Sequence, residues 1–266
     1  MVIFLPRIAR TYSDVKVYHI TIRGIDKQDI FFDEYDKHKF MSILKETKEK
    51  YNNEIYAYCL MDNHVHLVIY DKEQKISKIM QSIEISYAFY FNMKYERTGH
   101  LFQNRFFSKK IEDREYLKMV CRYIHQNPLK AGIEKTEKYK WSSYKEYIQS
   151  PKIINNKLLL SVFSENIEVA KQEFIRFHNA NINDDKETEI ADMMEYELCE
   201  RLTDDEMKKY ICELLNIKSV REISQYNTEI RNEKLSKLKC FKNISISQLS
   251  RITGINRKMI ERAIKK

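Results

Sequence analysis

Hydrophobic and polar residues follow two different periods along the first half of the chain. Residues 15–23 alternate and are rich in β-branched and aromatic side chains, as expected for a half-buried strand. Residues 35–51 carry apolar positions at helical spacing between lysines and glutamates. Two apolar runs, 55–61 and 64–70, are separated by a two-residue Asp-Asn turn and predict a β-hairpin.

A second helix, a strand and a third helix follow. Residues 76–95 place an apolar stripe on a long helix, and 105–111 predict one more strand. Residues 113–126 predict a helix that Pro128 should stop. The order β-α-β-β-α-β-α is that of a ferredoxin-like antiparallel sheet with one appended helix. We therefore predict an α+β fold for the first half of the chain.

From about residue 157 onward the pattern is helical, with no clear strand. Residues 244–265 predict two short amphipathic helices around Gly254, an arrangement that resembles a helix-turn-helix. Ser247 and Asn256 are the expected N-caps of these helices. The side chains expected to be buried there are Ile246, Leu249, Ile252, Ile255 and Ile260. We divide the chain into an α+β domain (1–150), a helical connector (151–230) and a helix-turn-helix-like module (231–266).

Composition excludes several classes of protein. The 266 residues are 43% hydrophobic and 12% aromatic, which is ample material for a core and argues against disorder throughout. No stretch approaches the roughly 18 apolar residues of a membrane helix, so we expect a cytoplasmic protein without a membrane partner. The five scattered cysteines show no CxxC spacing and indicate neither a disulfide framework nor a cysteine zinc site. No glycine-rich phosphate loop is present, so ATP or NAD chemistry is not expected.

The chain is basic, and its positive charge is unevenly distributed. Lys and Arg number 47 against 39 Asp and Glu, which gives a formal charge of 47 − 39 = +8. The excess is concentrated at the end of the chain, where residues 231–266 hold 11 basic side chains and only Glu233 and Glu261, so 11 − 2 = +9. We therefore place a basic terminal module after an acidic helical connector.

Two histidines are the first candidate site. His64 and His66 lie two residues apart on a predicted strand, so both rings point to the same face of the sheet and could share one metal ion. Taken alone, the pair is equally described as polar residues on an open sheet face. The hairpin, however, is the most hydrophobic part of the domain. Two polar histidines at such a central position are unusual, which favours a functional role for the pair.

A tyrosine and an asparagine are the second candidate. Tyr123 and Asn127 are four residues apart on the predicted third helix, so both project from one helical face and can converge on one point. With 18 tyrosines in the chain, this pair alone would be read as core packing or helix capping. Tyr116 lies seven residues earlier on nearly the same face, so helical phase does not separate the two tyrosines.

A family resemblance connects these residues. The segments YHITIRG, MDNHVHLVI, GHLFQNRFFSKKI and EYLKMVCRYIHQNPLKAGI occur in this order. Together they resemble the IS200-like (Y1, HUH single-tyrosine) transposases, and in particular their REP-associated tyrosine transposase branch, over roughly residues 5–150. The family's histidine pair corresponds to His64 and His66, and its tyrosine followed by Asn or Gln corresponds to Tyr123 and Asn127.

The resemblance implies cleavage and rejoining of single-stranded DNA at hairpin-forming sites. It gives the metal-ligand role to His64, His66 and Asn127, and the role of nucleophile, forming a 5′-phosphotyrosine, to Tyr123. A phenol with a pKa near 10 is a poor nucleophile at neutral pH, so it needs a metal-activated phosphate and accurate positioning. Two imidazoles and an amide oxygen without a thiolate suit Mg²⁺ or Mn²⁺, with zinc the less favoured ion.

The DNA contacts expected in the first domain are basic residues near this site: Arg23, Arg105, Lys109 and Lys110. In the terminal module, the residues expected to meet duplex DNA are Arg251, Asn256, Arg257 and Lys258. A helical bundle that only caps the chain is the alternative for that module.

Alternative functions remain open at this stage. A catalytically silent DNA- or RNA-binding regulator would keep the same fold, and a phosphodiesterase would hydrolyse DNA without forming an adduct. Either a monomer or a homodimer is compatible with the sequence, and Tyr123 could act in its own chain or in a partner's site.

Overall fold

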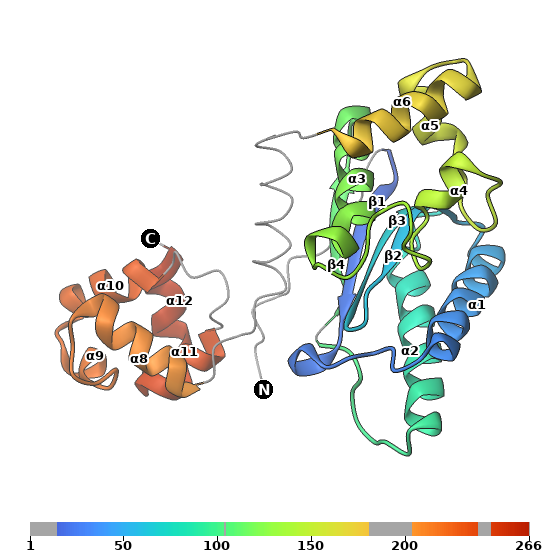
Figure 1. Ribbon diagram of the computed structural model, residues 1–266. Coiled ribbons are helices and arrows are strands. Elements are labelled where there is room, and N and C mark those ends of the chain that lie inside the picture. Colours follow the sequence, from blue (N-terminus) through green and yellow to red (C-terminus); the bar gives the residue numbers. More distant parts are fainter. Residues whose placement is uncertain (1–14, 104, 181–203, 239–245, 266) are drawn as a thin grey trace. The chain divides into compact units, whose positions relative to one another are not determined.

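The computed structural model describes residues 15–103, 105–180, 204–238 and 246–265. These residues fall into two compact units, one within Thr11–Leu198 and the other within Cys199–Lys266 (Figure 1). Among the described residues, no helix has the length and apolar character needed to cross a membrane.

The first unit is built on a four-stranded sheet. Its strands are β1 (Val17–Arg23), β2 (Glu54–Leu60), β3 (His64–Tyr70) and β4 (Phe107–Ile111). They are ordered β2-β3-β1-β4, and every neighbouring pair is antiparallel. With α1 (Glu34–Tyr51), α2 (Ile76–Lys94) and α3 (Arg114–Lys130), the elements follow the expected β-α-β-β-α-β-α order. The predicted ferredoxin-like α+β fold is confirmed.

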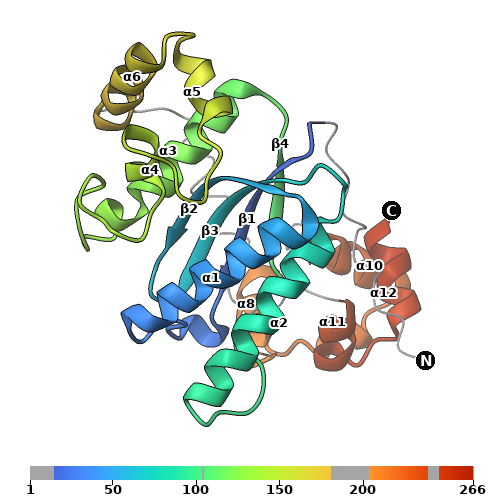
Figure 2. The ribbon, with the colours of Figure 1, turned by 90° about the vertical axis from the view of Figure 1, so that its right-hand side faces the viewer.

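The two faces of the sheet are covered by different helices. Helices α1 and α2 lie against one face and α3 against the other (Figures 1 and 2). Because side chains alternate along a strand, β3 sends Val65, Leu67 and Ile69 to one face and His64 and His66 to the other. The apolar set, fully buried, packs under α1 and α2. The histidines face α3.

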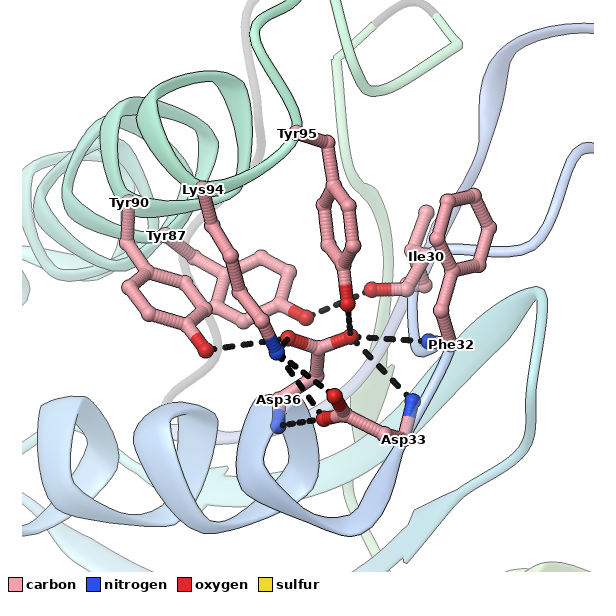
Figure 3. A network of polar contacts seen from close by, with 8 residues as sticks. All are labelled: Ile30, Phe32, Asp33, Asp36, Tyr87, Tyr90, Lys94 and Tyr95. Carbon is pink, nitrogen blue, oxygen red and sulfur yellow. Dashed lines mark hydrogen bonds and ion pairs between the residues drawn. The ribbon is translucent and has the colours of Figure 1, made fainter.

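A buried carboxylate ties the start of α1 to the end of α2 (Figure 3). Asp36 is fully buried and accepts hydrogen bonds from the Tyr95 hydroxyl (2.7 Å) and the Tyr90 hydroxyl (3.0 Å), while the Lys94 ammonium lies 2.7 Å from it. The backbone N–H groups of Phe32 and Asp33 also donate to this carboxylate. Burial alone would raise the pKa of Asp36, but these donors lower it overall, so the carboxylate stays charged.

Helix α3 does not stop before Pro128, contrary to our expectation. It continues to Lys130, with Pro128 inside its last turn, and the Ala131 N–H donates to the carbonyl of Asn127 (2.9 Å). Proline removes its own N–H bond, but N–H groups after it still close the turn, since Ala131 donates to Asn127 and Ile133 donates to Pro128.

Three further helices complete the first unit. They are α4 (Tyr144–Ile148), α5 (Lys157–Phe163) and α6 (Ile167–Asn179), and their apolar residues join the same core as the sheet. His125 on α3 is fully buried and bridges Ser143 (2.7 Å) and His178 on α6 (2.9 Å). This histidine therefore fastens α6 to α3, and the unit extends beyond the expected boundary at residue 150.

The second unit is entirely helical within its described residues. It contains α8 (Asp204–Leu215), α9 (Glu222–Gln225), α10 (Thr228–Lys237), α11 (Ile246–Thr253) and α12 (Arg257–Lys265). One hydrophobic core runs from Met207 to Ala263, so residues on both sides of the expected boundary at 230 share it.

The last two helices, α11 and α12, are joined by a short turn at Gly254. All five isoleucine and leucine positions expected to be buried are buried. Gly254 has a φ of 74° in the turn, a conformation that glycine adopts without strain. Asn256 caps α12 by accepting the N–H of Lys258 (2.9 Å), as predicted. Ser247 lies inside α11 instead of capping it, because the helix already includes Ile246.

Candidate active site

The register of the sheet brings the histidine pair together with polar residues of β1. Thr21 is opposite His66 and Arg23 is opposite His64, so all four side chains lie on the face that α3 covers. The centroids of the two imidazole rings are 4.9 Å apart, with the rings nearly perpendicular. The sequence prediction that both rings share one face is therefore realised by the structure.

Both histidines are uncharged at neutral pH. Burial, reinforced by the positive charge of Arg23, lowers the pKa of His64 to about 4, although Asn127 and Asp62 oppose the shift. Burial and the neighbouring His64 and His19 rings lower the pKa of His66 well below its usual range. Neutral rings keep a lone pair that can bind a metal ion or accept a proton.

Tyr123 lies edge-on against this cluster. Its ring centroid is 5.7 Å from that of His66 and 6.4 Å from that of His19. The Lys130 ammonium lies 5.0 Å from the centre of the Tyr123 ring. The contact is a cation–π interaction, in which the ammonium is attracted to the face of the ring.

Asn127 joins the tyrosine to the histidines. Its side-chain N–H donates to the backbone carbonyl of Tyr123, one turn earlier (2.8 Å). The Asn127 side chain also lies close enough to His64 and His66 to oppose the lowering of their pKa values. The spacing of four residues on α3 therefore places Asn127 over the histidine pair while Tyr123 lies beside it.

The structure separates the two tyrosines that helical phase left equivalent. The ring of Tyr116 lies under the Lys109 ammonium, 4.7 Å away, near the start of α3. Tyr123 lies against the histidines instead. Asp62, in the turn before them, forms an ion pair with Lys37 (2.7 Å) and is more than half exposed, which fits a turn residue.

Sequence analysis missed two residues of this site, His19 and Thr21. His19 Nε2 and Thr21 Oγ1 lie 3.4 Å and 3.1 Å from Nδ1 of His66. Burial, aided by Lys109, lowers the pKa of His19 to about 3. The signal was present in the alternation of β1, where His19, Thr21 and Arg23 occupy every second position of an otherwise apolar strand.

The donor set is compatible with a divalent cation. Nδ1 of His64 is held by the side-chain oxygen of Asn63 (2.6 Å), and Nδ1 of His66 by the β1 residues. Each ring is thus oriented through one nitrogen, as in metal-binding histidines whose second nitrogen is the ligand. Within the described ranges, no three His, Cys, Asp or Glu side chains form a metal-binding group, so a cation here would need the Asn127 amide.

Comparison with known proteins identifies the region that carries these residues. Residues 12–127 match the family described as "Transposase IS200 like". This region is therefore similar to the IS200-like transposases. A protein from Haemophilus influenzae, named as a candidate REP-associated tyrosine transposase, is 27% identical over 148 residues, covering 51% of this chain and 83% of the relative.

Two solved structures are also similar to the chain. The structure titled as a REP-associated tyrosine transposase bound to a REP hairpin has a TM-score of 0.46 and 16% identity, covering 53% of this chain and 84% of that one. A candidate transposase from Deinococcus radiodurans has a TM-score of 0.33 and 16% identity, with coverages of 42% and 92%.

The basic residues of the first unit that are expected to bind DNA lie in different places. Lys109 is paired with His19 in the sheet and shares the face of the histidines, whereas Lys110, the next residue, points to the other face and lies 3.7 Å from Glu112. Arg23 adjoins the histidine pair. Arg105 is exposed just before β4. Strand alternation therefore separates the Lys109–Lys110 pair that the sequence placed together.

In the second unit, the residues expected to contact duplex DNA also lie in different environments. Arg251 makes two hydrogen bonds to Asp204 at the start of α8 (2.5 and 2.6 Å), which fastens α11 to α8. Asn256 and Lys258 are exposed at the start of α12, and Arg257 is half-buried.

Proposed function

We propose that this protein is a metal-dependent single-strand DNA transposase that cleaves and rejoins DNA through a 5′-phosphotyrosine intermediate. The observation that carries the proposal is the meeting of Tyr123, His64, His66 and Asn127 on one face of the sheet. The similarity of this region to the IS200-like transposases supports the reaction class. Its resemblance to the REP-associated branch supports hairpin-forming single strands as the substrate.

A divalent ion, Mg²⁺ or Mn²⁺, would be held by His64, His66 and Asn127 and would supply Lewis-acid polarisation of the scissile phosphate. The neutral state of both histidines is what such binding requires, because a protonated imidazole has no lone pair to donate. Asn63 and Thr21 would keep the two rings oriented toward the ligand position.

Tyr123 would carry out the covalent step. Its phenolic oxygen attacks the phosphorus and loses its proton, and the bond from phosphorus to the 3′ oxygen breaks. The 3′ oxygen takes up a proton, which leaves a free 3′-OH and a DNA 5′ end joined to Tyr123. A 3′-OH from another strand reverses the step and releases the tyrosine, so no ATP is needed.

The second unit would bind duplex DNA through the start of α12. The exposed Asn256 and Lys258 lie where a recognition helix meets base edges and phosphates. Lys258→Ala is expected to weaken duplex binding and to reduce the salt dependence by about one counterion. Fluorescence anisotropy on duplex DNA from the region of the gene, at several salt concentrations, measures both. An unchanged salt slope would favour the helical-bundle alternative.

A denaturing gel tests the catalytic proposal. The protein is incubated with Mn²⁺ and 3′-labelled single-stranded hairpin oligonucleotides taken from DNA flanking its own gene. We expect a labelled band at protein size that is lost in Tyr123→Phe and with EDTA but kept in Tyr116→Phe, the matched control. A nick without an adduct would indicate hydrolysis, and metal-independent binding without a nick would indicate a silent regulator.

A further inference from the structure

The C-terminal end of α6 is fastened to α3 by three hydrogen bonds. Nδ1 of His125 lies 2.9 Å from Nε2 of His178, and the side-chain N–H of Gln126 donates to the carbonyl of His178 (2.8 Å). The Arg122 guanidinium donates to the carbonyl of Ala180, the residue that follows α6. All three α3 side chains are buried, so these bonds are shielded from water.

The polarity of a helix end explains why α6 is held at this end. The last four carbonyls of a helix have no N–H partner within the helix, and they carry partial negative charge. Helix α6 ends at Asn179, so the carbonyl of His178 is one of these four. The cationic Arg122 and the amide of Gln126 therefore satisfy acceptors that burial would otherwise leave unpaired.

The His125–His178 bond has a defined direction. Nδ1 of His178 lies 2.9 Å from the carbonyl of Phe174, one turn earlier in α6. A carbonyl only accepts, so His178 carries its proton on Nδ1 and its Nε2 accepts from Nδ1 of His125. Nε2 of His125 then accepts from the Ser143 hydroxyl (2.7 Å). Each ring is thus held through both of its nitrogens, which fixes its orientation.

Tyr123 and Asn127 lie on a different face of the same stretch of α3. Successive residues of a helix are rotated by about 100°, so the three residues that bond to α6 form one face, and Tyr123 and Asn127 form another. On that second face the Tyr123 ring has its centroid 5.7 Å from that of His66. A rotation of α3 about its own axis would move Tyr123 and Asn127 away from the histidine pair and would also stretch the bonds to α6.

We propose that His178 is a positioning residue for the cleavage reaction, because it fixes the rotation of α3 and so keeps Tyr123 and Asn127 over the histidine pair. This role rests on the proposed function and extends it to α6, which lies outside the residues 12–127 that match the IS200-like family. Apolar packing of α3 on the sheet is non-directional, whereas hydrogen bonds weaken steeply with angle. A reacting group displaced by about 1 Å can lose roughly 100-fold in rate, so a small rotation of α3 matters.

Single-turnover adduct formation, with Mn²⁺ and a hairpin oligonucleotide both saturating, tests this role. His178→Leu removes both hydrogen bonds of the ring and is expected to slow adduct formation about 10-fold or more. His178→Gln offers His125 an amide in place of Nε2 and should recover most of the rate. Leu160→Ala is the matched control, since it removes a fully buried side chain of α5 from the same core. It should lower the stability but leave the rate unchanged. Circular dichroism at the assay temperature checks that all variants are folded.

Fluorine NMR measures the position of Tyr123 independently of cleavage. 3-Fluorotyrosine is incorporated at Tyr123 alone, and its resonance is recorded without DNA. We expect the resonance to shift in His178→Leu, to return in His178→Gln and to stay in place in Leu160→Ala. A wild-type chain that forms no adduct would contradict the proposed function, while the fluorine resonance would still decide the positioning role. A folded His178→Leu variant with the wild-type resonance, or with the wild-type rate, would overturn that role, and so would a Leu160→Ala variant that changes both equally.

Discussion

At the scale of single residues, the candidate site contains groups that orient other side chains. His66 is the most buried member of the histidine pair, and its Nδ1 faces the Thr21 hydroxyl of the neighbouring strand at 3.1 Å. A hydroxyl in this place can accept a proton from Nδ1, which would leave the lone pair of Nε2 for a metal ion. Thr21 thus acts on the chemistry through His66.

Thr21→Val removes the hydroxyl and keeps the shape of the side chain. We expect Mn²⁺ affinity to fall about 10-fold or more, because orienting partners of metal-binding histidines typically contribute that much. Titration calorimetry on the protein without DNA measures the affinity independently of cleavage. Thr21→Ser restores the hydroxyl and should recover binding. Equal affinity in the valine variant would mean that His19 alone orients the ring.

At the scale of elements, α1 and α2 are joined by a polar network that the hydrophobic pattern did not indicate. Apolar spacing placed both helices almost to the residue, since periodicity reports the face that each one buries. The periodicity does not indicate that Asp36, a charged residue, is fully buried. Some of its hydrogen-bonding partners are backbone groups in the loop just before α1. The others are side chains at the end of α2, more than fifty residues away in sequence.

Asp36→Asn tests this network. The amide cannot satisfy Lys94 and both tyrosine hydroxyls as the carboxylate does, so we expect the free energy of unfolding to fall by about 2–4 kcal/mol. Urea denaturation measures it. Glu34→Gln is the control, since Glu34 pairs with Lys140 while 62% exposed and should lower the free energy of unfolding much less. Equal effects of the two substitutions would contradict a special role for Asp36.

At the scale of the whole molecule, the two units differ in their buried histidines. The chain has seven histidines, all within residues 19–178, and the described core of the first unit buries His19, His66, His125 and His178. Burial lowers the pKa of His19 and His178 to about 3. The second unit has none. Acid should therefore affect the two units unequally.

Stability of the first unit is expected to fall as the pH drops from about 6.5 to 4. In that window the unfolded chain binds protons on histidines that stay neutral in the folded state, so each such histidine removes about 1.4 kcal/mol per pH unit. Trp141, the single tryptophan, lies in this unit, so its fluorescence during urea unfolding reports on it. Unfolding free energies that stay constant between pH 6.5 and 4.5 would contradict this prediction.

The sequence by itself determined the order of the elements, the faces of the strands and the pairs His64–His66 and Tyr123–Asn127. These properties are local, because side-chain direction follows from a period of two in strands and 3.6 in helices. Only the tertiary structure decided which side chains of different elements are in contact. It places His19 and Thr21 next to His66, and Tyr123 instead of Tyr116 beside the histidines. It also places Lys109 and Lys110 on opposite faces of the sheet. Such contacts depend on register and on the way α3 crosses the sheet, which are fixed by packing of residues far apart in the chain.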